Sequence, residues 1–170
     1  MWNTTFPARP DRRAHGFTLV ELLVVMVIIG IVASILIGFF VSGFRKTQLR
    51  DGAVQLLTDM RQVRSQAQRT SMGGSVALTS TTPSTPLKTY ATYLGNGTAT
   101  PTKTDRTLSD PIRVAPYTSG AAYATLAYSA PYGDVTATGV VWEVSSSVIS
   151  DKLYVKAVGV TGKVILSATP

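Results

Sequence analysis

An uninterrupted apolar run near the N-terminus constrains this chain more than any other feature. The run extends from Leu22 to Phe44, and none of its 23 residues is charged. As an α-helix it would be about 34 Å long, enough to cross a hydrocarbon core about 30 Å thick. A cleaved secretory signal has a shorter apolar core, of about 7 to 15 residues, and so small a domain could not enclose this run on all sides. We therefore predict a membrane-spanning helix.

Basic residues flank the run on both sides, so their number does not decide the orientation of the helix. Three arginines precede the run and three cations follow it: Arg9, Arg12, Arg13, Arg45, Lys46 and Arg50. Long segments are translocated largely regardless of their charge. We therefore expect a single-pass protein whose short N-terminal tail is cytoplasmic and whose C-terminal domain is extracytoplasmic.

The composition of the chain excludes several kinds of chemistry. There is no cysteine, and the single histidine is His15. Disulfides, thiolate metal sites and cysteine nucleophiles are therefore excluded. No pair of carboxylates with a spacing suited to acid–base catalysis stands out. We expect a protein that is not an enzyme and that has no cofactor or bound metal.

Glu21 places a carboxylate at the edge of the apolar run, where burial of an unpaired ion costs several kcal/mol. Two interpretations remain open. The acid could complement the positive end of the helix dipole. Alternatively, if the chain were cut after Gly16, the new amino group of Phe17 would lie four residues before Glu21, within reach of its own or a neighbouring chain's carboxylate.

Residues 12–23, with the sequence RRAHGFTLVELL, resemble the class III signal of type IV pilins and type II secretion pseudopilins. The resemblance implies that a prepilin peptidase removes a leader of residues 1–16 by cleavage between Gly16 and Phe17. It also implies N-methylation of Phe17 and use of residues 17–44 as both a transmembrane helix and the packing core of a filament.

Small residues recur every four positions in the apolar run, at Gly30, Ser34, Gly38 and Ser42. This spacing places them on one face of a helix. Such faces allow helices to approach closely in lipid, which favours a role in assembly. Glycine and serine are also simply tolerated in membrane helices, so both interpretations stay open.

Residues 45–70 continue the helical pattern with an amphipathic segment. Apolar residues recur at alternating steps of four and three: Leu49, Ala53, Leu56, Met60, Val63 and Ala67. We predict one helix over residues 17–70 whose second half lies on a sheet, in preference to a free coiled coil. The polar face carries Arg61, Arg64 and Arg69, which could contact phosphates or form a solvated face.

Residues 71–170 are predicted to form a β-rich globular domain, which makes the fold class α+β with an antiparallel sheet. Residues 79–107 are rich in Ser, Thr and Pro, a composition of turns, edge strands and loops, and Asn96 with Gly97 predicts a hairpin turn. Gly159 to Gly162 predicts a tight turn between the last two strands. The predicted strands are 75–80, 89–94, 121–129, 138–144, 152–158 and 163–167.

Residues 56–67 and 153–165 are similar to segments of the H-type pseudopilins and the FimT minor pilins. Some FimT-type pilins carry a C-terminal Gly-Arg-x-Arg element implicated in DNA binding. The matching positions are residues 162–165, where Lys163 keeps one charge and Ile165 lacks the second. The best local group of cations is Lys152, Lys156 and Lys163, which could contact DNA or form an ordinary solvated hairpin.

Together these features predict a minor pilin or pseudopilin with the pilin fold, located in the bacterial inner membrane and assembled into a pilus or pseudopilus. The partners that the resemblance implies are prepilin peptidase, other pilins or pseudopilins, the inner-membrane assembly platform and membrane lipid. Two alternatives stay open. One is a pilin-like DNA receptor for natural transformation, and the other is an extracytoplasmic binding domain with an unprocessed signal anchor. The sequence does not distinguish a pilus from a secretion or competence machine.

Overall fold

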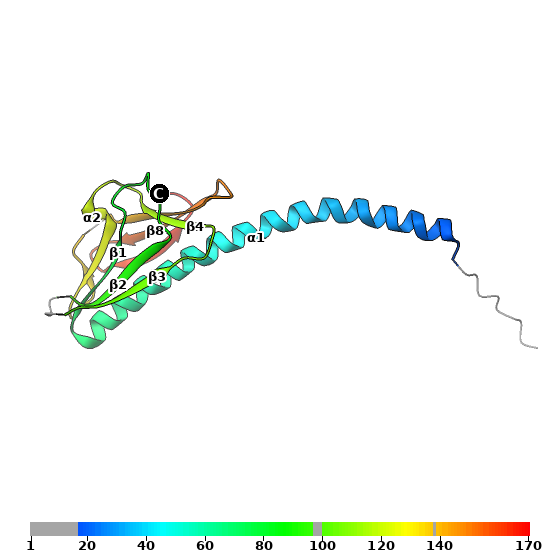
Figure 1. Ribbon diagram of the computed structural model, residues 1–170. Coiled ribbons are helices and arrows are strands. Elements are labelled where there is room, and N and C mark those ends of the chain that lie inside the picture. The colour runs from blue at the N-terminus through cyan, green and yellow to red at the C-terminus, as the bar shows by residue number, and fades with distance from the viewer. Residues whose placement is uncertain (1–16, 97–99, 138) are drawn as a thin grey trace, which may run out of the picture. The chain divides into compact units, whose positions relative to one another are not determined.

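The computed structural model describes residues 17–96, 100–137 and 139–170. The chain divides into two compact units, Met1–Phe40 and Val41–Pro170. Helix α1 (Leu19–Thr70) begins in the first unit and ends in the second, as its colour change from blue to green shows (Figure 1). The prediction of one long N-terminal helix is confirmed, although the helix begins two residues after Phe17.

The second half of α1 buries the predicted apolar stripe. Each of its six positions, from Leu49 to Ala67, is at most 3% exposed. Gly52 is buried beside the stripe, and a Cβ atom added there would lie 2.8 Å from Cγ2 of Ile112. The helix backbone therefore approaches the strand that carries Ile112 closely, and glycine is the residue that permits this approach.

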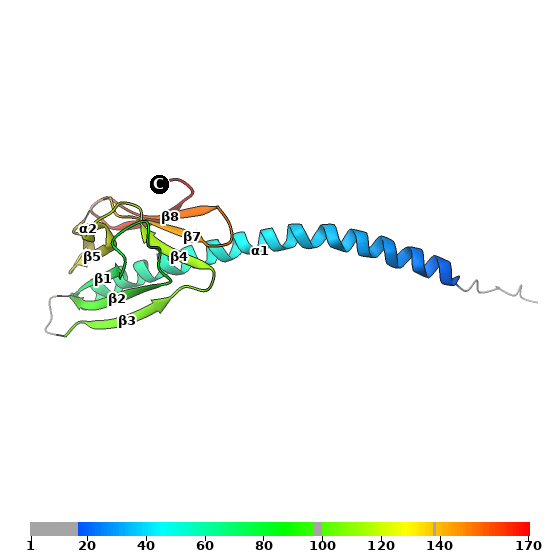
Figure 2. The same ribbon diagram turned by 45° about the horizontal axis from the view of Figure 1, so that its top comes forward.

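The described part of the second unit contains two antiparallel sheets rather than the single sheet that we expected. Figure 2 shows β3, β2, β1 and β5 side by side in the five-stranded sheet. Its order is β3-β2-β1-β5-β6. The bounds are β1 (Gly73–Leu78), β2 (Thr89–Asn96), β3 (Thr102–Thr107), β5 (Thr125–Ser129) and β6 (Asp134–Val135).

The four-stranded sheet has the order β4-β7-β8-β9. Its strands are β4 (Ile112–Pro116), β7 (Val141–Ser146), β8 (Lys152–Val158) and β9 (Lys163–Ser167). The bounds of β8 and β9 match the prediction, and Gly159 and Gly162 lie in the turn between them with φ values of +67° and +65°. These positive φ angles explain why both ends of the turn are glycine.

The other strand predictions were less accurate. Residues 121–124 form the short helix α2 (Ala121–Ala124) instead of the start of a strand. Strands β3 and β4 were not predicted as separate elements. Five of the six residues of β3 are exposed, so its sequence has no apolar alternation to reveal it, and β4 has only five residues and ends in proline. The predicted Asn96–Gly97 turn lies partly outside the described residues.

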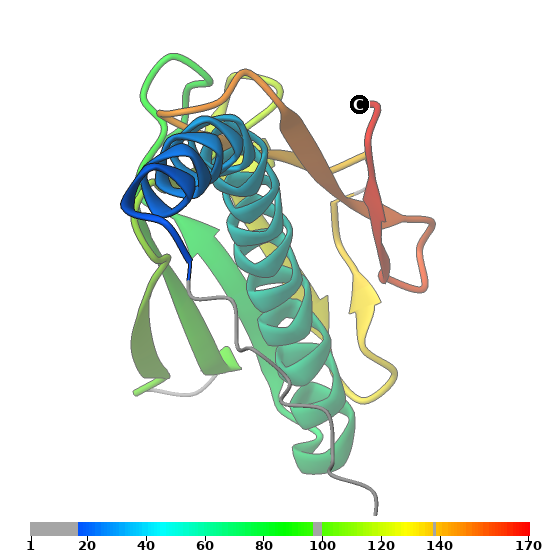
Figure 3. The same cartoon turned by 90° about the vertical axis from the view of Figure 1, so that its right-hand side faces the viewer.

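Both sheets share one core with α1, and Figure 3 shows the green part of the helix lying between strands of the two sheets. The predicted alternation in β7 is confirmed, because Val140, Trp142 and Val144 are at most 1% exposed while Val141 and Glu143 are half-buried. Nε1 of Trp142 donates a hydrogen bond to the carbonyl of Tyr123 at 2.7 Å. The largest core side chain is therefore buried without an unsatisfied donor.

A polar contact joins α1 to the five-stranded sheet. The hydroxyl of Tyr90 in β2 donates to Oδ2 of Asp59 in α1 at 2.6 Å, and Nε of Arg106 in β3 lies 3.4 Å from the same oxygen. Burial and the neighbouring Asp59 both raise the pKa of Tyr90, so the phenol stays protonated and can donate. Asp59 therefore satisfies a buried hydroxyl and neutralises a cation at the same time.

We expect Asp59→Ala to destabilise the globular unit by about 2 to 3 kcal/mol, because it leaves a buried hydroxyl unpaired and Arg106 without its acid. Asp51→Ala, on an exposed position of the same helix, should change stability by less than about 0.5 kcal/mol. Urea unfolding of the full chain in detergent micelles, followed by Trp142 fluorescence in a Trp2→Phe background, measures both. Equal stability of the two variants would contradict this role of Asp59.

Candidate assembly segment and basic surface

The N-terminus of α1 is capped by Thr18. The backbone N–H of Glu21 donates to Oγ1 of Thr18 at 3.2 Å, which places Glu21 at the third helical position, as in a capping box. The pattern Thr-x-x-Glu is the sequence signal that marks this cap. Among the described residues, the Glu21 carboxylate has no hydrogen bond or ion pair, so capping uses its backbone and leaves its side chain available.

The two predicted processing residues lie just before this cap. Phe17 precedes the helix and its side chain is 80% exposed. Gly16 lies outside the described residues. The described structure therefore places Phe17 in an accessible position next to the helix start.

The apolar segment from Leu22 to Phe44, which we call the stem, is exposed throughout. Its large apolar side chains are each at least 38% exposed, and Phe39 and Phe40 reach 75% and 77%. By length and composition, this part of α1 could cross a membrane. An isolated chain could not keep so much contiguous apolar surface in water, so the stem requires lipid or other protein around it.

The four small residues of the stem lie on this exposed surface. A Cβ atom added at Gly30 or Gly38 would meet nothing within 4 Å. The hydroxyl of Ser34 donates to the carbonyl of Ile31 at 2.7 Å, so its polarity is satisfied within the helix. Neither glycine is therefore required by packing within the described chain, and the small face is open to a partner.

The three lysines of the predicted DNA-binding group all lie on the β8–β9 hairpin. Strand alternation and the pairing of Val158 with Lys163 put them on the same face of the sheet. However, Nζ of Lys152 lies 2.8 Å from Oε1 of Glu143. This carboxylate raises the pKa of Lys152 and neutralises its charge locally. Only Lys156 and Lys163 therefore contribute unbalanced charge to this face.

Two arginines of α1 reach across to the β-strands. Nη2 of Arg61 donates to the carbonyl of Val164 in β9 at 3.2 Å, and Nε of Arg64 donates to the carbonyl of Gly133 at 3.3 Å. The sequence left open a solvated face or a phosphate-contacting face for these residues. Their guanidinium groups are anchored to backbone carbonyls near Lys163, a juxtaposition that depends on the tertiary fold.

Within the ranges that the structure describes, there is no group of three or more His, Cys, Asp or Glu side chains that could hold a metal ion.

The comparisons with known proteins agree with this arrangement. Residues 11–37 match the family described as the prokaryotic N-terminal methylation motif. The structure is similar to the crystal structure of the type IV minor pilin FimU of Pseudomonas aeruginosa, with 14% sequence identity and a TM-score of 0.55, covering 74% of this chain and 93% of that chain. No curated protein matches the chain significantly.

The chain carries a prokaryotic N-terminal methylation motif and has the pilin fold. The methylation motif covers the segment that contains Gly16, Phe17 and Glu21, and the pilin fold explains how a long helix and antiparallel sheets coexist. The apolar helix together with the motif fits a pilin that is anchored in the inner membrane.

The β8–β9 turn of the pilin-like chain gives a test of local packing. At Gly162, a Cβ atom would lie 2.7 Å from Cγ1 of Val135 and 2.9 Å from Cε1 of Tyr128, whereas at Gly159 nothing lies within 4 Å. Both have positive φ. We expect Gly159→Ala to cost about 1 to 2 kcal/mol from backbone strain alone, and Gly162→Ala to cost about 1 to 3 kcal/mol more from the clash.

Thermal or urea unfolding of the two glycine variants, measured side by side in the same detergent, checks this expectation. A Gly159→Ala variant that is less stable than Gly162→Ala would show that the turn is not packed as described.

Proposed function

We propose that this chain is a minor pilin or pseudopilin, a structural subunit of a type IV pilus-like or type II secretion filament. Prepilin peptidase cleaves the precursor between Gly16 and Phe17, and the new N-terminus is N-methylated. The subunit is stored in the inner membrane with its globular unit outside the cytoplasm. The inner-membrane assembly platform then transfers it into a filament with other pilins or pseudopilins.

The observation that carries this proposal is the exposed stem with one acid at its start. Full burial of a Val, Leu, Ile or Phe side chain is worth about 1.5 to 3 kcal/mol. Lipid supplies that burial in the membrane, and neighbouring stems supply it in a filament. Because both environments are apolar, the subunit can move between them at little cost in hydrophobic free energy, and specific contacts decide where it goes.

Glu21 is the strongest candidate for such a contact. Its carboxylate has no partner among the described residues, and an unpaired acid at the edge of a membrane is unfavourable. After cleavage, the amino group of Phe17 on a neighbouring subunit would be a cation of matching charge and position along the stem. Pairing between the two would set the axial register of one subunit against the next.

The small residues of the stem have a complementary role in this proposal. Gly30, Ser34, Gly38 and Ser42 would let a neighbouring helix approach closely enough for backbone-to-backbone packing. The exposure of these positions and the open space at Gly30 and Gly38 support this role. The similarity to a protein named as a minor pilin supports minor rather than major subunit status.

The two alternatives receive less support. A DNA receptor would use Lys152, Lys156 and Lys163, but the first of these is paired with Glu143. An unprocessed signal anchor would explain the apolar stem, but it would give Glu21 no partner and the methylation motif no purpose. Filament assembly accounts for both features, so we place it first.

The role of Glu21 can be separated from helix capping with two variants. Glu21→Gln keeps the backbone bond to Thr18 and removes the charge, whereas Thr18→Ala removes the capping hydroxyl and keeps the charge. We expect both variants to remain in the membrane fraction. Filament incorporation should fall at least about tenfold for Glu21→Gln, which corresponds to about 1.4 kcal/mol. Immunoblots that compare the amount of subunit in sheared filaments with the amount in membranes measure this.

Thr18→Ala should reduce incorporation less, because it keeps the charge of Glu21 and loosens only the first turn of the helix, at a local cost of about 1 kcal/mol. Unchanged incorporation of Glu21→Gln would contradict the proposed pairing. An equal defect in the two variants would mean that Glu21 acts by stabilising the start of α1 and not by pairing with a neighbouring subunit.

A further inference from the structure

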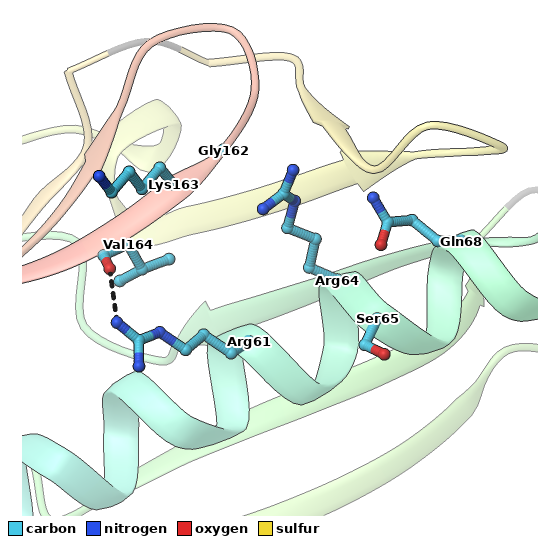
Figure 4. A pocket seen from close by; sticks show the side chains of 7 residues that line it. All are labelled: Arg61, Arg64, Ser65, Gln68, Gly162, Lys163 and Val164. Carbon is cyan, nitrogen blue, oxygen red and sulfur yellow. Dashed lines mark hydrogen bonds between the residues drawn. The ribbon is translucent and has the colours of Figure 1, made fainter.

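A pocket of about 220 Å³ lies between α1 and the start of β9, within the globular unit. Figure 4 shows Arg61 and Arg64 reaching from the helix toward the segment that carries Gly162 and Lys163. Three of the lining side chains are cations, and none is acidic. The full lining is Arg61, Arg64, Ser65, Gln68, Gly162, Lys163 and Val164.

The two arginines are held in place by the backbone. Arg61 donates to the carbonyl of Val164 and Arg64 to the carbonyl of Gly133, each through a single nitrogen. The amide of Gln68 is fixed in the same way, donating to the carbonyl of Tyr132 at 2.7 Å. Since a guanidinium group carries five N–H donors, both arginines keep donors for a ligand while losing little further freedom on binding.

The charge of the pocket is not balanced within the described chain. Most acids of the globular unit are paired, including Asp59, Asp110 and Glu143. By contrast, no ion pair within the described ranges involves Arg61, Arg64 or Lys163. Three cations that line one pocket repel each other, and an anion in the pocket would offset this repulsion.

A buried tyrosine lies behind Gly162, one of the residues that line the pocket. Tyr128 is 2% exposed, and its hydroxyl has no hydrogen-bond partner among the described residues. The edge of its ring lies against Gly162, where an added Cβ would be 2.9 Å from Cε1. Burial raises the pKa of Tyr128, so the group is a neutral donor. A buried donor without an acceptor is unfavourable. Tyr128 is not one of the lining residues, so this donor lies behind the wall of the pocket.

We propose that this pocket binds one phosphate group. The formal charge of three cations matches a phosphate better than a carboxylate, and tetrahedral oxygens can accept from donors that arrive from several directions. The pocket is smaller than typical ligand sites of about 300 to 1,000 Å³, so it suits a single group. This inference goes beyond the proposed role in filament assembly and does not depend on it.

The test uses the full chain, labelled with ¹⁵N and purified in a maltoside detergent, which contains no phosphate. Inorganic phosphate is titrated at constant ionic strength while the Nε–Hε resonance of Arg64 is followed. We expect a saturable shift. Lys163→Ala should raise the midpoint concentration at least about fivefold, because it removes one charge-assisted contact.

Lys156→Ala is the matched control, since Lys156 lies on the same hairpin but does not line the pocket. Its midpoint should change less than twofold. No saturable shift, or an equal effect of the two lysine variants, would overturn the proposal. Stronger binding of acetate than of phosphate would overturn the choice of ligand.

A short single-stranded oligonucleotide provides the last arm. The affinity of the oligonucleotide could fall with salt as steeply as several phosphate contacts require, and Lys156→Ala could weaken binding as much as Lys163→Ala. In that case the surface binds a polyanion along its length, and the pocket proposal is wrong. Binding that competes with inorganic phosphate and depends only on Lys163 supports the pocket. None of these outcomes bears on cleavage at Gly16 or on incorporation of Glu21 variants, so the two proposals fail separately.

Discussion

From Leu49 to Ala67, α1 buries its apolar stripe against two sheets of the same chain, whereas from Leu22 to Phe44 its apolar side chains have no such cover among the described residues. The rest of the structure depends on this difference along one helix. The buried part fixes the sheets through a shared core. The exposed part must find its cover in lipid or in other chains, so the subunit is complete only in a membrane or an assembly.

The acidic side chains of α1 differ between its buried and exposed parts in the same way as its apolar side chains. In the globular unit, Asp59 lies on the polar side of the helix and satisfies Tyr90 and Arg106 across the interface with the sheet. Immediately before the stem, Glu21 has only its backbone engaged among the described residues. A carboxylate that is satisfied within its chain stabilises the fold, whereas one that is left without a partner at the edge of the membrane favours whichever neighbour supplies a cation. This contrast is the physical basis for assigning Glu21 to assembly.

The sequence predicted those parts of the fold that depend on local periodicity. The stripe on α1, the alternation in β7 and the bounds of β8 and β9 all follow from spacing, and all were confirmed. Strand β3 was missed because its edge position lets polar residues occupy both faces. The division into two sheets depends on long-range pairing, which local patterns do not encode.

For the candidate sites, too, the sequence predicts what is contiguous in the chain and not what the fold brings together. The positions of Phe17 and Glu21 follow from a contiguous motif, so the sequence alone identifies them. By contrast, the pocket joins Arg61 and Arg64 to Lys163, about 100 residues later in the chain, with bonds to backbone carbonyls that carry no sequence signal. The pairing of Lys152 with Glu143 was missed for the same reason, and it weakens the lysine group that the sequence favoured.

The central claim is that Phe17, shortly before the stem, is a free, modified end that other subunits recognise. Intact-mass and N-terminal peptide mass spectrometry of the chain purified from native envelopes tests this claim most directly. The account predicts a chain that lacks residues 1–16 and begins with N-methylated Phe17. Recovery of the chain with residues 1–16 still attached, from membranes and filaments alike, would contradict it.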